Sequence, residues 1–99
     1  MPYGIEFVRD ATDELRGLRK TDQVKVLDQI DRHLTYEPAR QSKSRIKRLR
    51  AKTFPPYRLR VDKFRIYYDI DEPNLVVMVY GVVRKDQSEA WLRGATLDH

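Results

Sequence analysis

The residues of this 99-residue chain that are best suited to chemistry are its cations, which gather in one segment. Eleven of the twenty Lys and Arg residues lie within residues 40–65, where Asp62 is the only acid. The segment therefore carries a net charge of +10, against +5 for the whole chain. Cations held as a set on one rigid face bind polyanions, of which nucleic acid is the commonest. The segregated charge thus indicates a nucleic-acid-binding surface.

The second half of the basic segment has the alternating pattern of a β-hairpin. Residues 57–61 and 64–70 are strand patterns separated only by Asp62 and Lys63, which predicts a tight two-residue turn. Successive strand residues face opposite sides of a sheet, so this register places the apolar side chains on one face and the cations on the other.

The predicted register also decides which cations meet. Arg60 is set opposite Arg65, and Arg58 opposite Tyr67, on the face away from the core. Like charges directly opposite on a sheet repel, so such a pair needs good solvation or an anion between its members. Two guanidinium groups over one phosphate would form short charge-assisted hydrogen bonds, and the Tyr67 ring is suited to stacking on a base. A solvated basic face is the alternative.

Conventional catalytic groups are sparse. The two histidines are His33, late in a predicted helix, and His99, the last residue. The carboxylates Asp69, Asp71 and Glu72 gather near a turn, where solvation or pairing with Arg is the ordinary outcome. The absence of cysteine excludes disulfides, thiolate catalysis and Cys-ligated zinc, and there is no Gly-rich phosphate loop. We expect neither a metal nor a cofactor.

Catalysis by cations remains available if the substrate is RNA, because RNA carries its own nucleophile, the 2′-OH. Arg and Lys can stabilise the charge that develops when this oxygen attacks the adjacent phosphate, and they can orient the reacting groups. A proton acceptor and a proton donor are also required, and the sequence leaves their identity open.

The rest of the chain supplies the elements that carry these residues. In chain order we expect a strand at 2–8, a helical hairpin over 11–35, a basic loop at 39–56, strands at 57–61, 64–70 and 75–83, and a short helix at 86–92. This order, β-α-α-β-β-β-(α), predicts an α+β fold in which the helical hairpin packs on a four-stranded, mostly antiparallel sheet. The length suits a single domain over residues 1–99.

The helices have expected caps and an expected buried face. Asp10 or Thr12 is the predicted N-cap of the first helix, and Thr21 that of the second. The apolar stripe of the second helix is predicted to hold Val24, Leu27, Ile30 or Asp31, and Leu34. The chain start has no signal-peptide pattern and the longest apolar run, 75–80, is strand-sized. We therefore expect a cytoplasmic protein with no membrane association.

Three segments resemble the RelE/ParE superfamily of bacterial type II toxins: Tyr57-Arg-Leu-Arg-Val61, Phe64-Arg-Ile-Tyr-Tyr-Asp-Ile-Asp71 and Val76 to Lys85. The resemblance extends to the N-terminus and covers nearly the whole chain. It implies a RelE-like fold and, for RelE-type members, a metal-independent endoribonuclease (mRNA interferase) that cleaves mRNA on the ribosome and so inhibits translation.

The resemblance also implies roles for individual residues. Those expected to act in cleavage are Arg60 and Arg65, which would stabilise the phosphate, with Arg84 or Lys85 assisting. Those expected to bind RNA are Arg58, Tyr67, Trp91, Arg45, Lys47, Arg48, Arg50 and Lys52. The expected partners are a cognate antitoxin protein, the ribosome and mRNA, with operator DNA bound through the antitoxin in a toxin–antitoxin hetero-oligomer.

Two alternatives share the fold. ParE-type relatives poison DNA gyrase instead of cutting mRNA. A catalytically weakened RNA- or ribosome-binding member is the other alternative, since Trp91 occupies a position where the family often has tyrosine. Arg58 and Arg60 likewise replace lysine, and Arg is a poor proton donor at neutral pH.

Overall fold

The computed structural model describes all of residues 1–99 and is built around one five-stranded sheet. Its elements in chain order are β1 (Gly4–Phe7), α1 (Arg9–Arg16), α2 (Lys20–Leu34), β2 (Ile46–Arg48), β3 (Tyr57–Val61), β4 (Phe64–Asp71), β5 (Val76–Arg84), the short 3-10 helix η1 (Lys85–Gln87) and α3 (Ser88–Asp98). The strand order is β1-β5-β4-β3-β2, with β1 parallel to β5 and the other neighbours antiparallel. The predicted α+β class is confirmed, with five strands instead of four.

The additional strand is β2, which lies inside the segment expected to be a basic loop. It has only three residues and pairs antiparallel with β3 at the edge of the sheet. A strand this short shows no alternation of its own, so its existence depends on the neighbour with which it pairs. The terminal helix differs too, because α3 runs over Ser88–Asp98, beyond the range expected for it.

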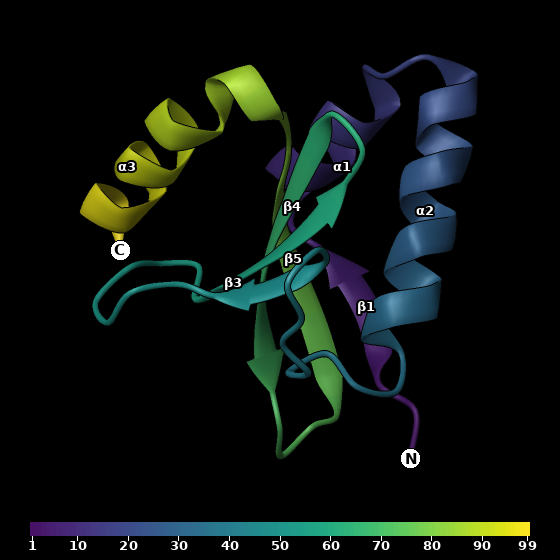
Figure 1. Ribbon diagram of the computed structural model, residues 1–99, viewed down its shortest axis with the longest axis vertical. Helices are drawn as coiled ribbons and strands as arrows, with labels where there is room; N and C mark the ends of the chain where they lie inside the picture. Colours follow the sequence, from purple (N-terminus) through teal and green to yellow (C-terminus); the bar gives the residue numbers. More distant parts are fainter.

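Helices cover the two faces of the sheet unequally. The pair α1 and α2 lies on one side, and α3 extends along the other side, where it approaches the loop that leads into β3 (Figure 1). The hydrophobic core lies between the sheet and the α1–α2 pair. Leu59, Ile66 and Val79 contribute to it from the sheet, and Val26 and Ile30 from α2.

The buried face of α2 is the predicted one only in part. Ile30 and Leu34 are buried as expected, but Val24 and Leu27 are 58% and 43% exposed, and Val26 is fully buried in their place. Helical spacing permitted either face. The face that contains Val24 also carries Asp28 and Asp31, and burying it would desolvate carboxylates at a large cost.

The predicted helix caps are also wrong. The residues before the first turns of α1 and α2 are Val8 and Arg19, and neither forms a side-chain capping bond. The start of α1 is fixed by tertiary structure: the Val8 N–H donates to the Val79 carbonyl at 3.0 Å, which continues the pairing of β1 with β5 up to the helix. None of the helices combines the length and apolar character that a membrane span requires.

Candidate nucleic-acid-binding site

The hairpin of β3 and β4 carries the predicted arginine set in the predicted register. Arg60 pairs with Arg65 and Arg58 with Tyr67, so these residues share the sheet face opposite the core. Asp62 in the turn has φ of 52°, which a two-residue hairpin turn requires. We call Arg58, Arg60 and Arg65 the arginine clamp.

Arg65 is the buried member of the clamp, with 6% of its surface exposed. Its Nη1 donates to the carbonyl oxygens of Asp62 and Phe64 at 2.9 and 2.8 Å. Both bonds use Nη1, which leaves Nε and Nη2 for a ligand. Burial lowers the pKa of the Arg65 guanidinium, and the positive charges of Arg60 and Arg58 lower it further. The site therefore holds a desolvated cation among like charges, an arrangement that a bound anion would relieve.

Arg58 and Arg60 are free of protein partners. The Arg58 Nε is buried and has no hydrogen-bond acceptor. Buried polar groups are nearly always bonded, so this N–H beside two other guanidinium groups is available to an oxygen from outside the protein, either of a ligand or of water. Arg60 is exposed, and no carboxylate lies within ion-pair distance of it.

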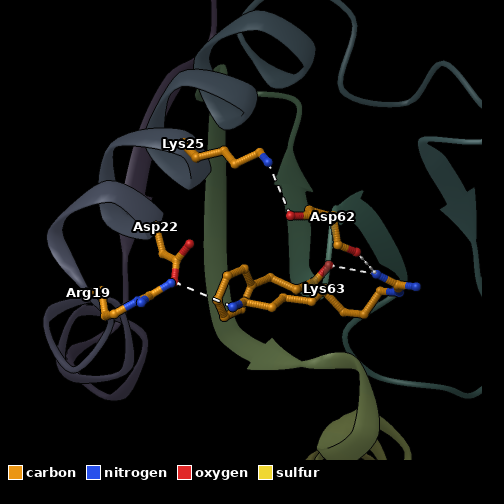
Figure 2. A network of polar contacts seen from close by, with 7 residues as sticks. Arg19, Asp22, Lys25, Asp62 and Lys63 are labelled. Atoms are coloured by element: carbon orange, nitrogen blue, oxygen red, sulfur yellow. Dashed lines mark hydrogen bonds and ion pairs between the residues drawn. The ribbon is translucent and has the colours of Figure 1, made fainter.

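The acid in the hairpin turn does not neutralise the clamp. The Asp62 carboxylate instead accepts from Lys25 of α2 at 3.1 Å, and Lys63 reaches Asp22 of the same helix at 3.8 Å (Figure 2). Arg19 joins the network through Asp22 at 3.8 Å. These contacts tie the turn to α2 on the core side. They hold the hairpin in place while directing its carboxylate away from the arginines.

The predicted stacking role of Tyr67 does not fit this conformation. Tyr67 is only 2% exposed because Trp91 of α3 covers it, with ring centroids 4.9 Å apart and planes at 15°. Trp91 also fills the space over Gly81, where an added Cβ would lie 2.7 Å from Cε2 of the indole. Trp91 is itself partly exposed, so the indole is the aromatic group of this stack that solvent can reach.

Arg84 is not brought into the clamp. It pairs with Phe64, whose side chain is in the core, so the register directs Arg84 toward the helical side of the sheet. There its Nε lies 3.6 Å from Asp86. The resemblance allowed either Arg84 or Lys85 at this later basic position, and the register separates Arg84 from the clamp. Lys85 lies beside the hairpin turn, since its N–H donates to the Lys63 carbonyl at 2.8 Å.

The remaining predicted RNA-binding cations spread along β2 and the loop that follows. Lys47 pairs with Arg58 and so shares the clamp face. Arg48 is engaged by Tyr57, donating to its hydroxyl at 2.9 Å and lying over its ring at 5.1 Å. Arg50 and Lys52 are exposed in the loop after β2. Arg45 lies apart from these, in a hollow beside α2.

One carboxyl group near the site was not predicted. The Glu14 Oε1 of α1 accepts from the Val82 N–H at 2.9 Å, beyond the point where β1 stops pairing with β5. Burial raises the pKa of Glu14, while the Val82 N–H and the Trp91 indole oppose the rise. The sequence showed only that Glu14 lies in a predicted helix. Its burial arises from contacts with β5 and α3, which the sequence does not reveal.

The end of α3 is fastened to the loop that precedes β3. Thr96 Oγ1 accepts from the Phe54 N–H at 3.2 Å and donates to its carbonyl at 3.1 Å. The Phe54 ring stacks on His99, with centroids 3.6 Å apart. These contacts fix α3, and with it Trp91, over the clamp face of the sheet. His99 is thus a packing residue here.

Solved structures similar to this chain include toxins and toxin–antitoxin complexes. The RelBE2 toxin–antitoxin complex from Mycobacterium tuberculosis contains a chain 26% identical to this one, with a TM-score of 0.69 over 85% of this chain and 99% of that chain. The archaeal RelE–RelB complex from Pyrococcus horikoshii matches with 22% identity and a TM-score of 0.69, over 86% of this chain and 97% of that chain. The isolated Escherichia coli RelE toxin matches with 20% identity and a TM-score of 0.61, over 92% and 97%. No family model and no curated protein sequence matches the chain.

The sheet order and these likenesses define the class, a small α+β protein with the fold of the RelE toxins. The chain is similar in fold to the RelE toxins, as the hairpin motifs indicated.

Proposed function

We propose that the chain, acting as one domain over residues 1–99, is the toxin of a toxin–antitoxin pair and a ribosome-dependent mRNA endoribonuclease. The observation that carries the proposal is the arginine clamp: three guanidinium groups on one sheet face, without a carboxylate partner and with an orphaned Arg58 Nε. A phosphate between Arg60 and Arg65 would satisfy these donors and offset their repulsion. The proposed compartment is the cytoplasm, where ribosomes and mRNA meet.

The clamp residues have distinct proposed roles in cleavage. The 2′-oxygen forms a bond to phosphorus as the bond to the 5′-oxygen breaks, which gives a cyclic phosphate and a 5′-hydroxyl. The 2′-OH loses its proton and the departing 5′-oxygen gains one. Arg60 and Arg65 stabilise the charge on the equatorial oxygens, and Arg58 positions the phosphate. Lys85 lies beside the turn and assists, while Trp91 offers its exposed edge to a base.

The proposed protein partner is a cognate antitoxin that covers the clamp face. Three of the similar structures are toxin–antitoxin complexes of the RelBE type, which supports a partner of this kind. An antitoxin segment with acidic residues would satisfy the same guanidinium groups as a phosphate does. Binding of antitoxin and of RNA would then be mutually exclusive.

A weakened, RNA-binding function is the second candidate, and one observation favours it. The clamp face presents arginines, which are poor proton carriers, and its tyrosine is buried under Trp91. Such a protein would bind RNA tightly and cut it slowly.

Mapping mRNA 5′ ends in a cell-free translation reaction separates these candidates. New ends that require ribosomes and fall in codon register support the nuclease. Intact mRNA with stalled ribosomes supports the weakened binder. Intact mRNA with unaffected translation, together with inhibited supercoiling by gyrase, would instead support a ParE-type poison.

A further inference from the structure

A second basic site lies apart from the clamp, between the C-terminal part of α2 and the chain that leads into β2. It is a hollow of about 390 Å³. Its polar lining combines three arginines, one histidine, three hydroxyl groups and one carboxylate, so that cations outnumber the single acid: Arg32, Arg40, Arg45, His33, Tyr36, Ser42, Ser44 and Glu37. Guanidinium and hydroxyl donors converging on one concavity are the groups that recognise phosphate.

The charge of this hollow is only partly compensated. Arg40 pairs with Glu37 at 3.4 Å, and Arg32 with Asp28 at 3.1 Å. All four side chains are more than half exposed, and ion pairs of this kind are weak and easily exchanged. No carboxylate lies within ion-pair distance of Arg45. The Arg45 guanidinium group is therefore free to bind a ligand in the hollow.

The loop geometry presents a hydroxyl beside this free guanidinium. The Ser42 Oγ accepts from the N–H groups of Arg45 and Ile46, at 3.0 and 3.4 Å. With its oxygen occupied as an acceptor, the hydroxyl has its proton to donate to a ligand. These bonds hold Arg45 and Ser42 together at the entry to β2.

The pKa of His33 is sensitive to the positive charges that line the hollow. Its Nε2 lies 3.1 Å from Gln29 Oε1. Burial lowers the pKa of His33, the charges of Arg45 and Arg32 lower it further, and Asp28 opposes them. The neighbouring charged groups thus disfavour the protonated imidazole overall, as expected where cations outnumber acids.

The hollow is also connected to the clamp through the sheet. The Arg45 carbonyl accepts from the Arg60 N–H at 2.8 Å, so the two residues lie side by side across adjacent strands. Neighbouring strands are about 4.8 Å apart. One polyanion can therefore reach from the clamp, around the edge formed by β2, to the hollow beside α2.

We propose that this hollow binds a second phosphate of the RNA strand held by the clamp, through Arg45, Arg32 and the Ser42 hydroxyl. That the bound phosphate belongs to RNA rests on the proposed function. That the hollow binds a phosphate group at all rests only on the residues that line it. A strand fixed at two phosphates is held in register for attack at the clamp. The hollow is a binding site, and no step of the cleavage takes place in it.

The test follows the His33 imidazole resonances by NMR during pH titrations of the full chain. The ligands are inorganic phosphate and a short single-stranded RNA with 2′-O-methyl groups, which cannot be cleaved by 2′-OH attack. We expect either ligand to raise the His33 pKa by about one unit, because an anion nearby favours the imidazolium. Arg45→Gln should raise the pKa of free His33 and abolish the further rise with ligand.

A matched control removes the same charge elsewhere. Arg9→Gln alters an exposed arginine at the start of α1, beside the opposite edge of the sheet from β2, and should leave the His33 response intact. Arg45→Gln should also make the slope of log affinity for RNA against log salt shallower by about 0.7, the value for one single-strand phosphate contact. Arg9→Gln should leave this slope unchanged.

The outcomes separate the second site from the proposed function. RNA that shifts the Trp91 indole resonance while His33 does not respond overturns the second site and leaves the clamp intact. A response of His33 to inorganic phosphate but not to RNA overturns RNA as the occupant. If RNA shifts neither the Trp91 indole resonance nor the His33 resonance, the proposed RNA binding is overturned. In that case the response of His33 to inorganic phosphate decides whether the hollow binds phosphate at all.

Discussion

Trp91 packs directly on Gly81 and stacks on Tyr67, on the clamp face of the sheet. Gly81 has no positive φ, so its backbone tolerates alanine. An added Cβ would nevertheless lie 2.7 Å from both Cε2 and Cη2 of Trp91, and closer still to Cζ2. Real Cβ atoms do not approach rings so closely. In Gly81→Ala the indole must therefore leave its place over Tyr67.

The cost of this displacement has two sources. The stacked pair of Tyr67 and Trp91 contributes about 0.5–1.5 kcal/mol beyond its buried area. Overpacking of a well-filled site costs about 1–3 kcal/mol. We expect Gly81→Ala to destabilise the protein by about 2 kcal/mol, which corresponds to a melting temperature about 10 °C lower for a domain of this size.

Thermal unfolding and tryptophan fluorescence are the appropriate assays, since Trp91 is the only tryptophan. We expect a lower melting temperature and an emission maximum shifted to the red in Gly81→Ala. The control is Gly81→Ala in a Trp91→Ala background, where the clash is absent and the substitution should have no cost. An unchanged melting temperature and emission spectrum in the single variant would refute the placement of α3 described above.

Three further predictions follow from the site and the core. Arg60→Ala should weaken RNA binding and make its log–log salt slope shallower by about 0.7, whereas Arg84→Ala should leave that slope unchanged, as measured by fluorescence anisotropy. The raised pKa of Glu14 means that its contribution to stability is fully present below the unfolded-state pKa, about 4.3, and is lost as pH rises through the folded value. Denaturant unfolding should therefore show wild type losing stability relative to Glu14→Gln as pH rises over this range, and a constant difference would contradict the burial of Glu14. Val26→Ala should cost about 2 kcal/mol and Val24→Ala less than about 0.5 kcal/mol, and equal costs would contradict the orientation of α2.

The part of the site that sequence could predict is the part set by local rules. A two-residue turn leaves one register for the hairpin, so the opposition of Arg60 and Arg65 followed from counting residues. The order of most elements followed from periodicity and turn residues in the same way. The RelE-like fold was indicated by motifs that lie on these same strands.

The parts that could not be predicted depend on contacts between distant segments. The three residues of β2 become a strand only because β3 offers an edge. Tyr67 is buried only because α3 returns across the sheet, and Arg45 reaches its hollow only because α2 ends beside it. The buried face of α2 is different, because Asp28 and Asp31 beside Val24 were a signal in the sequence that could have excluded that face.

The most direct test of the central claim, that the arginine clamp cleaves mRNA on the ribosome, compares matched variants in cell-free translation. Arg60→Ala removes a clamp charge and Arg9→Ala removes a remote one, and new mRNA 5′ ends are mapped for each with and without ribosomes. The account predicts ribosome-dependent ends in codon register for the wild type and for Arg9→Ala, and a strong loss of those ends in Arg60→Ala. Ends that are equally abundant in Arg60→Ala, or mRNA that stays intact with the wild type, would contradict it.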